Sequence, residues 1–92
     1  MSIIKRTGII SRDPELRFTM SRLAVCNFII TEENEAEHRV VCFAEIAEKA
    51  AELNHGDKVT ISGYFKRREW KDRDGHARGI IELTAKKIEK IT

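Results

Sequence analysis

The chain is poor in the residues that interrupt, cross-link or anchor a protein. Its 92 residues include one proline, five glycines and two cysteines. Cys26 and Cys42 do not have C-x-x-C spacing, so we expect buried, reduced thiols and no disulfide framework. No apolar run is long enough to cross a bilayer, and residues 1–6 lack the apolar stretch of a signal peptide. We therefore expect one globular domain over 1–92 with no membrane segment, long enough to bury a modest core.

Motifs for enzymatic chemistry are equally scarce. The three histidines share no metal-ligand spacing with each other or with the cysteines. The chain has no phosphate-binding glycine loop, no nucleophile elbow and no H-E-x-x-H motif. The sequence thus predicts a protein that is not an enzyme and that uses neither a metal nor a cofactor.

Charge is abundant but unevenly distributed. Charged residues make up 35% of the chain, for a net charge of only +2. The stretch 32–52 carries seven glutamates against Arg39 and Lys49, which leaves the rest of the chain strongly basic. A basic surface with one acidic sector is typical of a nucleic-acid-binding protein.

Hydrophobic periodicity predicts five strands and one helix. Period-two patterns predict strands over 3–11, 23–31, 37–43, 58–70 and 78–91, and a helical period with following Gly56 predicts a helix over 44–53. The 86–90 end of the last strand is also compatible with a helix. We expect a turn at 12–15, where Pro14 fixes the backbone, and a two-residue hairpin turn at Asp74-Gly75. This order predicts an all-β fold, a five-stranded Greek-key barrel of the OB type with the helix between strands three and four; an open meander with a packing helix is the alternative.

The stretch from Ser62 to Gly75 carries the strongest functional signal. In a strand, Tyr64, Lys66, Arg68 and Trp70 share one face. Aromatic rings offer planes for stacking unpaired bases, and cations between them can follow a phosphate backbone. On this stretch alone the alternative is a solvated basic hairpin with Trp70 packed on its own barrel.

Three segments, in the same order, resemble the bacterial single-stranded DNA-binding protein family. They are the first strand and Asp-Pro-Glu-x-Arg-aromatic turn over 8–18, the His-Arg-Val-Val-x-Phe strand leading into Ala-Glu over 37–48, and the hairpin over 63–75. The resemblance spans nearly the whole chain. It implies an OB-fold protomer that forms a homotetramer, with a dimer as the fallback, and binds single-stranded DNA in replication, recombination and repair. It also implies a location in the bacterial cytoplasm, with the nucleoid.

The resemblance also implies roles for individual residues. Phe43 and Trp70 would stack on bases, and His38 would lie near the protomer interface. Backbone contacts would come from Arg17, Arg39, Lys66 and Arg68. Three neighbours complete the predicted DNA-binding set: Phe18, which would either stack on a base or cover the barrel end, and Lys71 and Arg73, which belong to the basic cluster of the hairpin.

Several positions depart from the family pattern. Glu37 replaces a tryptophan, the loop over 31–36 is short, and Glu45 and Glu69 replace frequent lysines. We expect the acids at 32, 33, 35 and 37 to lie beside the DNA and weaken its binding. The chain ends at Thr92 without an acidic recruiting tip, as expected for a core domain or a short paralogue, although replication or repair proteins remain candidate partners. The alternatives are a replication-restart or primosome accessory protein acting through protein contacts, and an RNA-binding protein.

Overall fold

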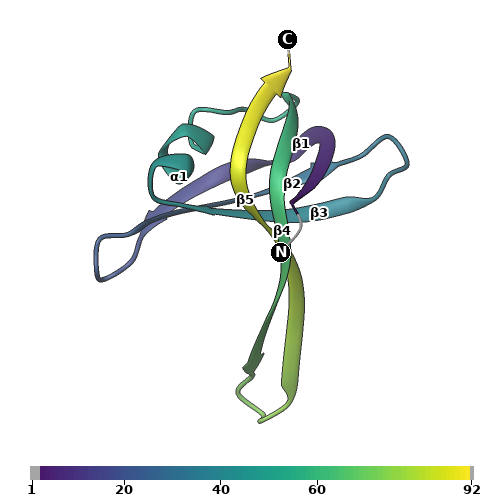
Figure 1. Ribbon diagram of the computed structural model, residues 1–92. Helices are drawn as coiled ribbons and strands as arrows, with labels where there is room; N and C mark the ends of the chain where they lie inside the picture. Colours follow the sequence, from purple (N-terminus) through teal and green to yellow (C-terminus); the bar gives the residue numbers. More distant parts are fainter. Residues whose placement is uncertain (1–2, 92) are drawn as a thin grey trace.

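The strands close into a barrel in the order β1-β2-β3-β5-β4 (Figure 1). This computed structural model describes residues 3–91; the ends of the predicted domain, residues 1–2 and 92, lie outside the described residues. The elements are β1 (Ile4–Phe18), β2 (Ala24–Thr31), β3 (Glu37–Phe43), α1 (Ala44–Ala50), β4 (Lys58–Lys71) and β5 (Ala77–Ile91). The predicted five-stranded OB barrel, with its helix between the third and fourth strands, is confirmed.

Alternation along β2 and β3 builds the barrel core. Ala24, Cys26, Phe28 and Ile30 are buried on one face of β2, as their period-two spacing predicts. From β3, Val40 and Cys42 enter the same core. From the other strands, the fully buried residues are Ile10, Val59, Ile61 and Leu83.

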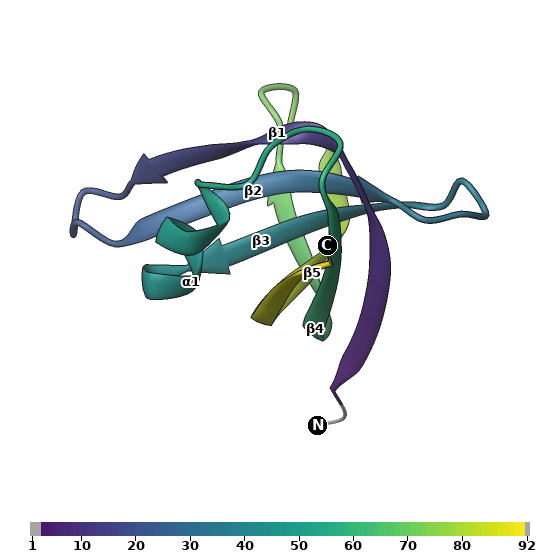
Figure 2. The ribbon, with the colours of Figure 1, turned by 90° about the horizontal axis from the view of Figure 1, so that it is seen from above.

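The helix covers one end of this core. Ala47 and Ala50 of α1 are completely buried, and Ile46 and Leu53 pack against the core from its margin. Figure 2 shows α1 beside β2 and β3, the strands that it contacts most. The helix ends at Ala50 and not at Leu53 as predicted, because the following residues form two turns that lead to β4. Among the described residues, no helix has the length and apolar character needed to cross a membrane.

Two glycines permit close approach between strands. A Cβ atom on Gly63 would lie 1.8 Å from the carbonyl oxygen of Thr84, and one on Gly8 would lie 2.7 Å from that of Thr31. The β4–β5 register shifts between Ser62 and Gly63. The predicted bend of β4 at Gly63 therefore coincides with a β-bulge at a point where no side chain fits.

Two predicted turns differ from the structure. β1 continues through 12–15 to Phe18, because two register shifts against β2 absorb the irregularity around Pro14 without ending the strand pairing. The predicted two-residue turn at Asp74-Gly75 is a five-residue loop, 72–76. Its geometry is set by Asp72, whose carboxylate accepts hydrogen bonds from the backbone amides of Asp74 and His76 and pairs with Arg78. These contacts, the His76 amide first, lower the pKa of Asp72.

The 86–90 end of the last strand is β-strand and not helix.

The barrel closes through a short parallel contact. β3 pairs with β5 only at Val40–Leu83 and Val41–Thr84, whereas β4 and β5 pair along their whole length. Beyond this junction the β4–β5 hairpin leaves the barrel as an arm, visible in Figure 1 as the green loop at the bottom. The arm carries Arg68 and Trp70 away from the helix end of the barrel.

Both cysteine side chains are buried in the barrel core. Cys26 and Cys42 are free and buried, and the Cys42 thiol donates a 3.4 Å hydrogen bond to the carbonyl oxygen of Cys26. Burial raises the pKa of Cys42 to about 12. We expect 5,5′-dithiobis(2-nitrobenzoate) to modify the native protein at pH 8 at least ~100-fold more slowly than the guanidinium-unfolded protein, as an opening free energy of about 3 kcal/mol would give. Fast modification of either thiol in the native state would contradict this burial.

Candidate nucleic-acid interface

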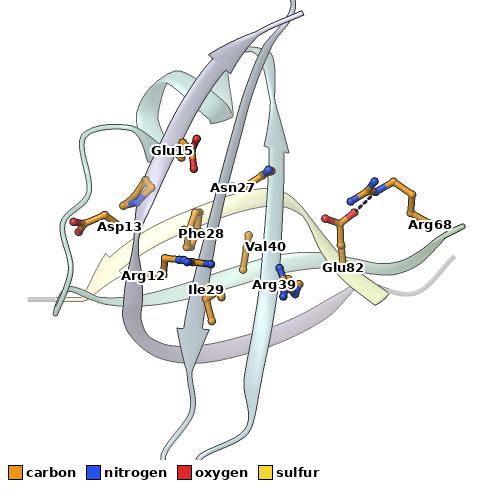
Figure 3. A pocket seen from close by; sticks show the side chains of 11 residues that line it. Arg12, Asp13, Glu15, Asn27, Phe28, Ile29, Arg39, Val40, Arg68 and Glu82 are labelled. Carbon is orange, nitrogen blue, oxygen red and sulfur yellow. Dashed lines mark hydrogen bonds and ion pairs between the residues drawn. The ribbon is translucent and has the colours of Figure 1, made fainter. Parts of the chain in front are cut away.

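A groove runs across the outside of the barrel, from β1 and β2 to the β4–β5 arm. It consists of two depressions, of about 640 and 420 Å³, that share Asn27, Arg68 and Glu82. Figure 3 shows the larger depression, with residues 12–15 at one end and Arg68 and Glu82 at the other. The groove thus crosses the junction between β3 and β5. In the OB fold, ligands bind over the second and third strands and the adjacent loops, which is where this groove lies.

Three aromatic rings line or flank the groove. Phe43, the last residue of β3, is 42% exposed and lines the smaller depression together with Tyr64 of β4. Trp70 is 43% exposed and lies farther along the same face of β4. Side chains of this size are normally buried more completely, so exposure of both predicted stacking residues is consistent with ligand contact.

Cations surround these rings. Arg17 and Lys66 line the smaller depression, Arg39 lines the larger one, and all three side chains are exposed. Arg12 adds a fourth positive charge at the β1 end. None of these four forms an ion pair within residues 3–91. Their positive charge is therefore available to an anionic ligand.

Arg68 has a more constrained position. Its Nε donates a 3.1 Å hydrogen bond to Glu82 Oε1, and its guanidinium lies 5.0 Å from the centre of the Trp70 ring. The Arg68 side chain is 60% exposed, whereas Glu82 is only 16% exposed. The pair therefore fixes the orientation of Arg68 while leaving its outer nitrogens open to solvent.

Four of the predicted DNA-binding residues line neither depression: Trp70, Phe18, Lys71 and Arg73. Phe18, 60% exposed, is at the far end of β1. Lys71 ends β4, on the face opposite Trp70 by strand alternation, and Arg73 lies in the loop at the tip of the arm. The structure therefore groups Phe43, Arg39, Lys66, Arg68 and Arg17 in the groove, with Trp70 beside Arg68. Phe18 lies between Arg17 and Thr19, which both line the smaller depression, and Lys71 and Arg73 lie toward the tip of the arm.

His38 faces the opposite side of β3 from Arg39. Its Nε2 lies 2.8 Å from Glu32 Oε1, and its ring is 5.7 Å from that of Phe65. Arg6 pairs with the same carboxylate at 3.5 Å and covers the Phe65 ring. Glu32 is therefore held by Arg6 and His38 within this cluster, and its place beside the DNA stays a prediction. Glu37 is exposed, next to Arg39 along β3.

Arg12, Asn27 and Glu82 were not predicted as site residues. Glu82 lies directly opposite Lys66 in the β4–β5 register, and residues that are directly opposite point to the same face of the sheet. Predicting the β4–β5 register from the sequence would therefore have placed Glu82 beside Lys66. Asn27 occupies an outward-facing position on β2, between buried neighbours. Arg12 joins the groove because β1 stays paired beyond the predicted turn.

One cluster at the tip of the arm has a simpler explanation. Ligand atoms of Asp72, Asp74 and His76 all lie within 4.8 Å of one another. Asp72 is already used by two backbone amides and by Arg78. The cluster therefore accounts for the conformation of the loop and carries no metal assignment.

The fold and the groove together define a small OB-fold binding protein. The sequence profile described as Single-strand binding protein family matches residues 3–91. The chain belongs to this family, which confirms the predicted resemblance and the expectation of a binding protein rather than an enzyme.

Curated relatives named single-stranded DNA-binding protein match most of the chain. A single-stranded DNA-binding protein from Paenarthrobacter aurescens is 36% identical over 96 residues, which cover 88% of this chain and 56% of that protein. Single-stranded DNA-binding proteins of Mycobacterium bovis and Mycobacterium tuberculosis are each 35% identical and covered over 58% of their length. The chain thus spans little more than half the length of these relatives.

Proposed function

We propose that this protein binds single-stranded DNA without strong sequence preference. The observation that carries the proposal is the exposure of Phe43, which lines the groove, and of Trp70, which lies beside it, together with cations along the groove that form no ion pair among the described residues. Family membership supports the same ligand. A single strand presents both unstacked bases and phosphates, whereas a duplex hides its base faces.

The arrangement assigns different tasks to the two kinds of side chain. Phe43 and Trp70 stack on bases, and Tyr64, which also lines the smaller depression, extends this apolar path. Phosphates are contacted by Arg17, Arg39, Lys66 and the outer nitrogens of Arg68. Longer strands reach Lys71 and Arg73 along the arm, and Phe18 at the end of β1.

The test uses Trp70, the only tryptophan in the chain, as an internal reporter. We expect oligo-dT to quench its fluorescence on binding, because a stacked base lies directly on the indole. A matched oligo-U titration separates DNA from RNA binding. A mobility shift that saturates while the fluorescence stays unchanged would exclude Trp70 as a stacking platform. No shift at all with either oligonucleotide would overturn the proposed function and favour an accessory protein acting through protein contacts.

We further propose a homotetramer, with a dimer as the fallback, that acts on DNA during replication, recombination and repair in the bacterial cytoplasm. One protomer offers few stacking groups, and several protomers together would present enough for a long strand to wrap around them. None of the four residues His38, Glu32, Arg6 and Phe65 lines the groove, and their cluster supplies a partly exposed surface for such contacts.

Light scattering at micromolar concentration is expected to give about four times the protomer mass of 10.6 kDa. A monomer under these conditions would exclude wrapping by a closed assembly. His38→Ala should lower the apparent mass if this histidine lies at an interface. His55→Ala, in the loop before β4, serves as the matched control.

A further inference from the structure

The middle of the groove contains a carboxylate, although phosphate binding would be stronger without one. Glu82 lines both depressions, and its side chain is mostly covered by its surroundings. A negative charge here repels phosphate, because coverage by protein reduces its screening by salt. The position therefore needs an explanation other than backbone attraction.

The chemistry of Glu82 suits a hydrogen-bond donor. Arg68 occupies Oε1 through one hydrogen bond. An ionised carboxylate accepts about four hydrogen bonds, so the group keeps free acceptor capacity toward the groove. The surrounding aromatic rings direct bases rather than phosphates inward, and the exocyclic amino group of cytosine is a typical donor to glutamate.

A second acceptor lies at the same place. Asn27 shares both depressions with Glu82, and its Oδ1 is buried without a hydrogen-bond partner among the described residues. Because Oδ1 is buried, a 180° rotation of the amide, which exchanges Oδ1 and Nδ2, is required for this oxygen to serve a ligand in the groove. An amino group with two hydrogens matches two acceptors, whereas thymine has no amino group.

We propose that Glu82, assisted by Asn27, forms a base-reading point that favours bases carrying an exocyclic amino group over thymine. This inference rests on the proposed binding of single-stranded DNA and adds a local preference to it. Arg68 positions the carboxylate through its hydrogen bond and neutralises part of its charge, which limits the repulsion of phosphate.

The experiment compares oligo-dC with oligo-dT of equal length at pH 8, where both strands are unfolded. In the wild type, the ratio of Kd for dT to Kd for dC sets the reference. Glu82→Gln should lower this ratio about tenfold, because binding to dC weakens relative to binding to dT. A factor of ten is the order expected for one good contact to a base edge. Glu89→Gln is the matched control, because Glu89 also lies on β5 and pairs with a cation, Lys87 at 3.3 Å, but lines neither depression. It should leave the ratio unchanged.

The outcomes are distinct. An equal gain in affinity for both oligonucleotides in Glu82→Gln would show that Glu82 only competes with phosphate for Arg68, and would overturn the proposal. An unchanged ratio would overturn it as well. If the wild type binds neither oligonucleotide, the proposed function fails, and this inference fails with it.

A second measurement keeps the proposal testable if Glu82→Gln does not fold. The wild-type protein is titrated with an oligonucleotide in which pyrimidin-2-one, cytosine without its amino group, replaces every cytosine. We expect about tenfold weaker binding than to oligo-dC, because ring size and charge are retained and only the donor is lost. Equal affinity for the two strands would exclude reading of the amino group.

Discussion

Replacing both Phe43 and Trp70 by alanine is expected to weaken binding of oligo-dT by about a hundredfold or more. Each base-aromatic stack contributes roughly 1–3 kcal/mol, and both rings are about 40% exposed along one ligand path. Alanine removes the rings without changing the charge of the groove. Fluorescence anisotropy of a labelled oligonucleotide measures the loss, because the double variant has no tryptophan reporter.

Lys66→Ala is the matched control for this variant. Lys66 lines the smaller depression beside Phe43, and its loss removes one phosphate contact. The dependence of log K on log salt should therefore become shallower by about 0.7 for Lys66→Ala and stay unchanged for the aromatic variant. If the aromatic variant binds like the wild type, stacking does not drive binding and the cations carry it alone.

The largest effect on stability is expected for Gly63→Ala. The new methyl group would lie 1.8 Å from the carbonyl oxygen of Thr84, a main-chain atom of the paired strand. Gly63 pairs with Ile4 on one side and with Ala85 on the other, so β4 cannot move away from one neighbour without disturbing the other. We expect a loss of about 3 kcal/mol or more, at the upper end of overpacking effects and a large share of the total stability of a domain this size.

Urea unfolding followed by circular dichroism at fixed protein concentration measures this loss. Gly79→Ala is the matched control in the same hairpin. A methyl group there meets only the side chain of Arg67, which is exposed and can rotate away. Its free energy of unfolding should change by less than about 1 kcal/mol. Similar stabilities for the two variants would show that the close approach at Gly63 is not a constraint.

Alkaline conditions should also destabilise the fold. The pKa of Cys42 is about 12 in the folded protein, above its ordinary value of 9.0. The unfolded chain therefore loses this thiol proton first as the pH rises. The contribution of the buried thiol is fully present below pH 9 and declines between pH 9 and 12.

The sequence predicted the bounds of β2, β3, β4 and β5 to within one residue, although burial does not alternate strictly along them. The bounds of β3, Glu37–Phe43, follow from its pattern alone, and β2 begins one residue later than predicted, at Ala24, and ends at Thr31 as predicted. β1 was cut short because Pro14 is normally incompatible with paired strand. In the barrel the register shifts on either side of Arg12 accommodate it, and pairing resumes as far as Phe18.

The sequence predicted those residues of the candidate site that share a face of a single strand, but not those that strand pairing brings together. Trp70, Lys66 and Arg68 share a face by their spacing, and Phe43 was recognised from its charged neighbours on β3. The groove itself arises where β2, β3, β4 and β5 meet, so Asn27 and Glu82 became visible only with the pairing of the strands. The partners of Glu32 were also not predicted, because Arg6 comes from β1, far away in the chain, and His38 from β3, after the loop that holds Glu32.

The short junction between β3 and β5 has a consequence for the dynamics of the barrel. With only two residue pairs joining strands that are distant in the chain, it has the fewest backbone contacts of any strand pairing here. Transient local opening should therefore begin at this point. The groove draws Asn27 and Arg39 from one side of the junction and Arg68 and Glu82 from the other. A molecule bound in the groove contacts both sides of the junction and therefore stabilises its closed state. Amide hydrogen exchange at Val40, Val41 and Leu83 should become slower when it binds.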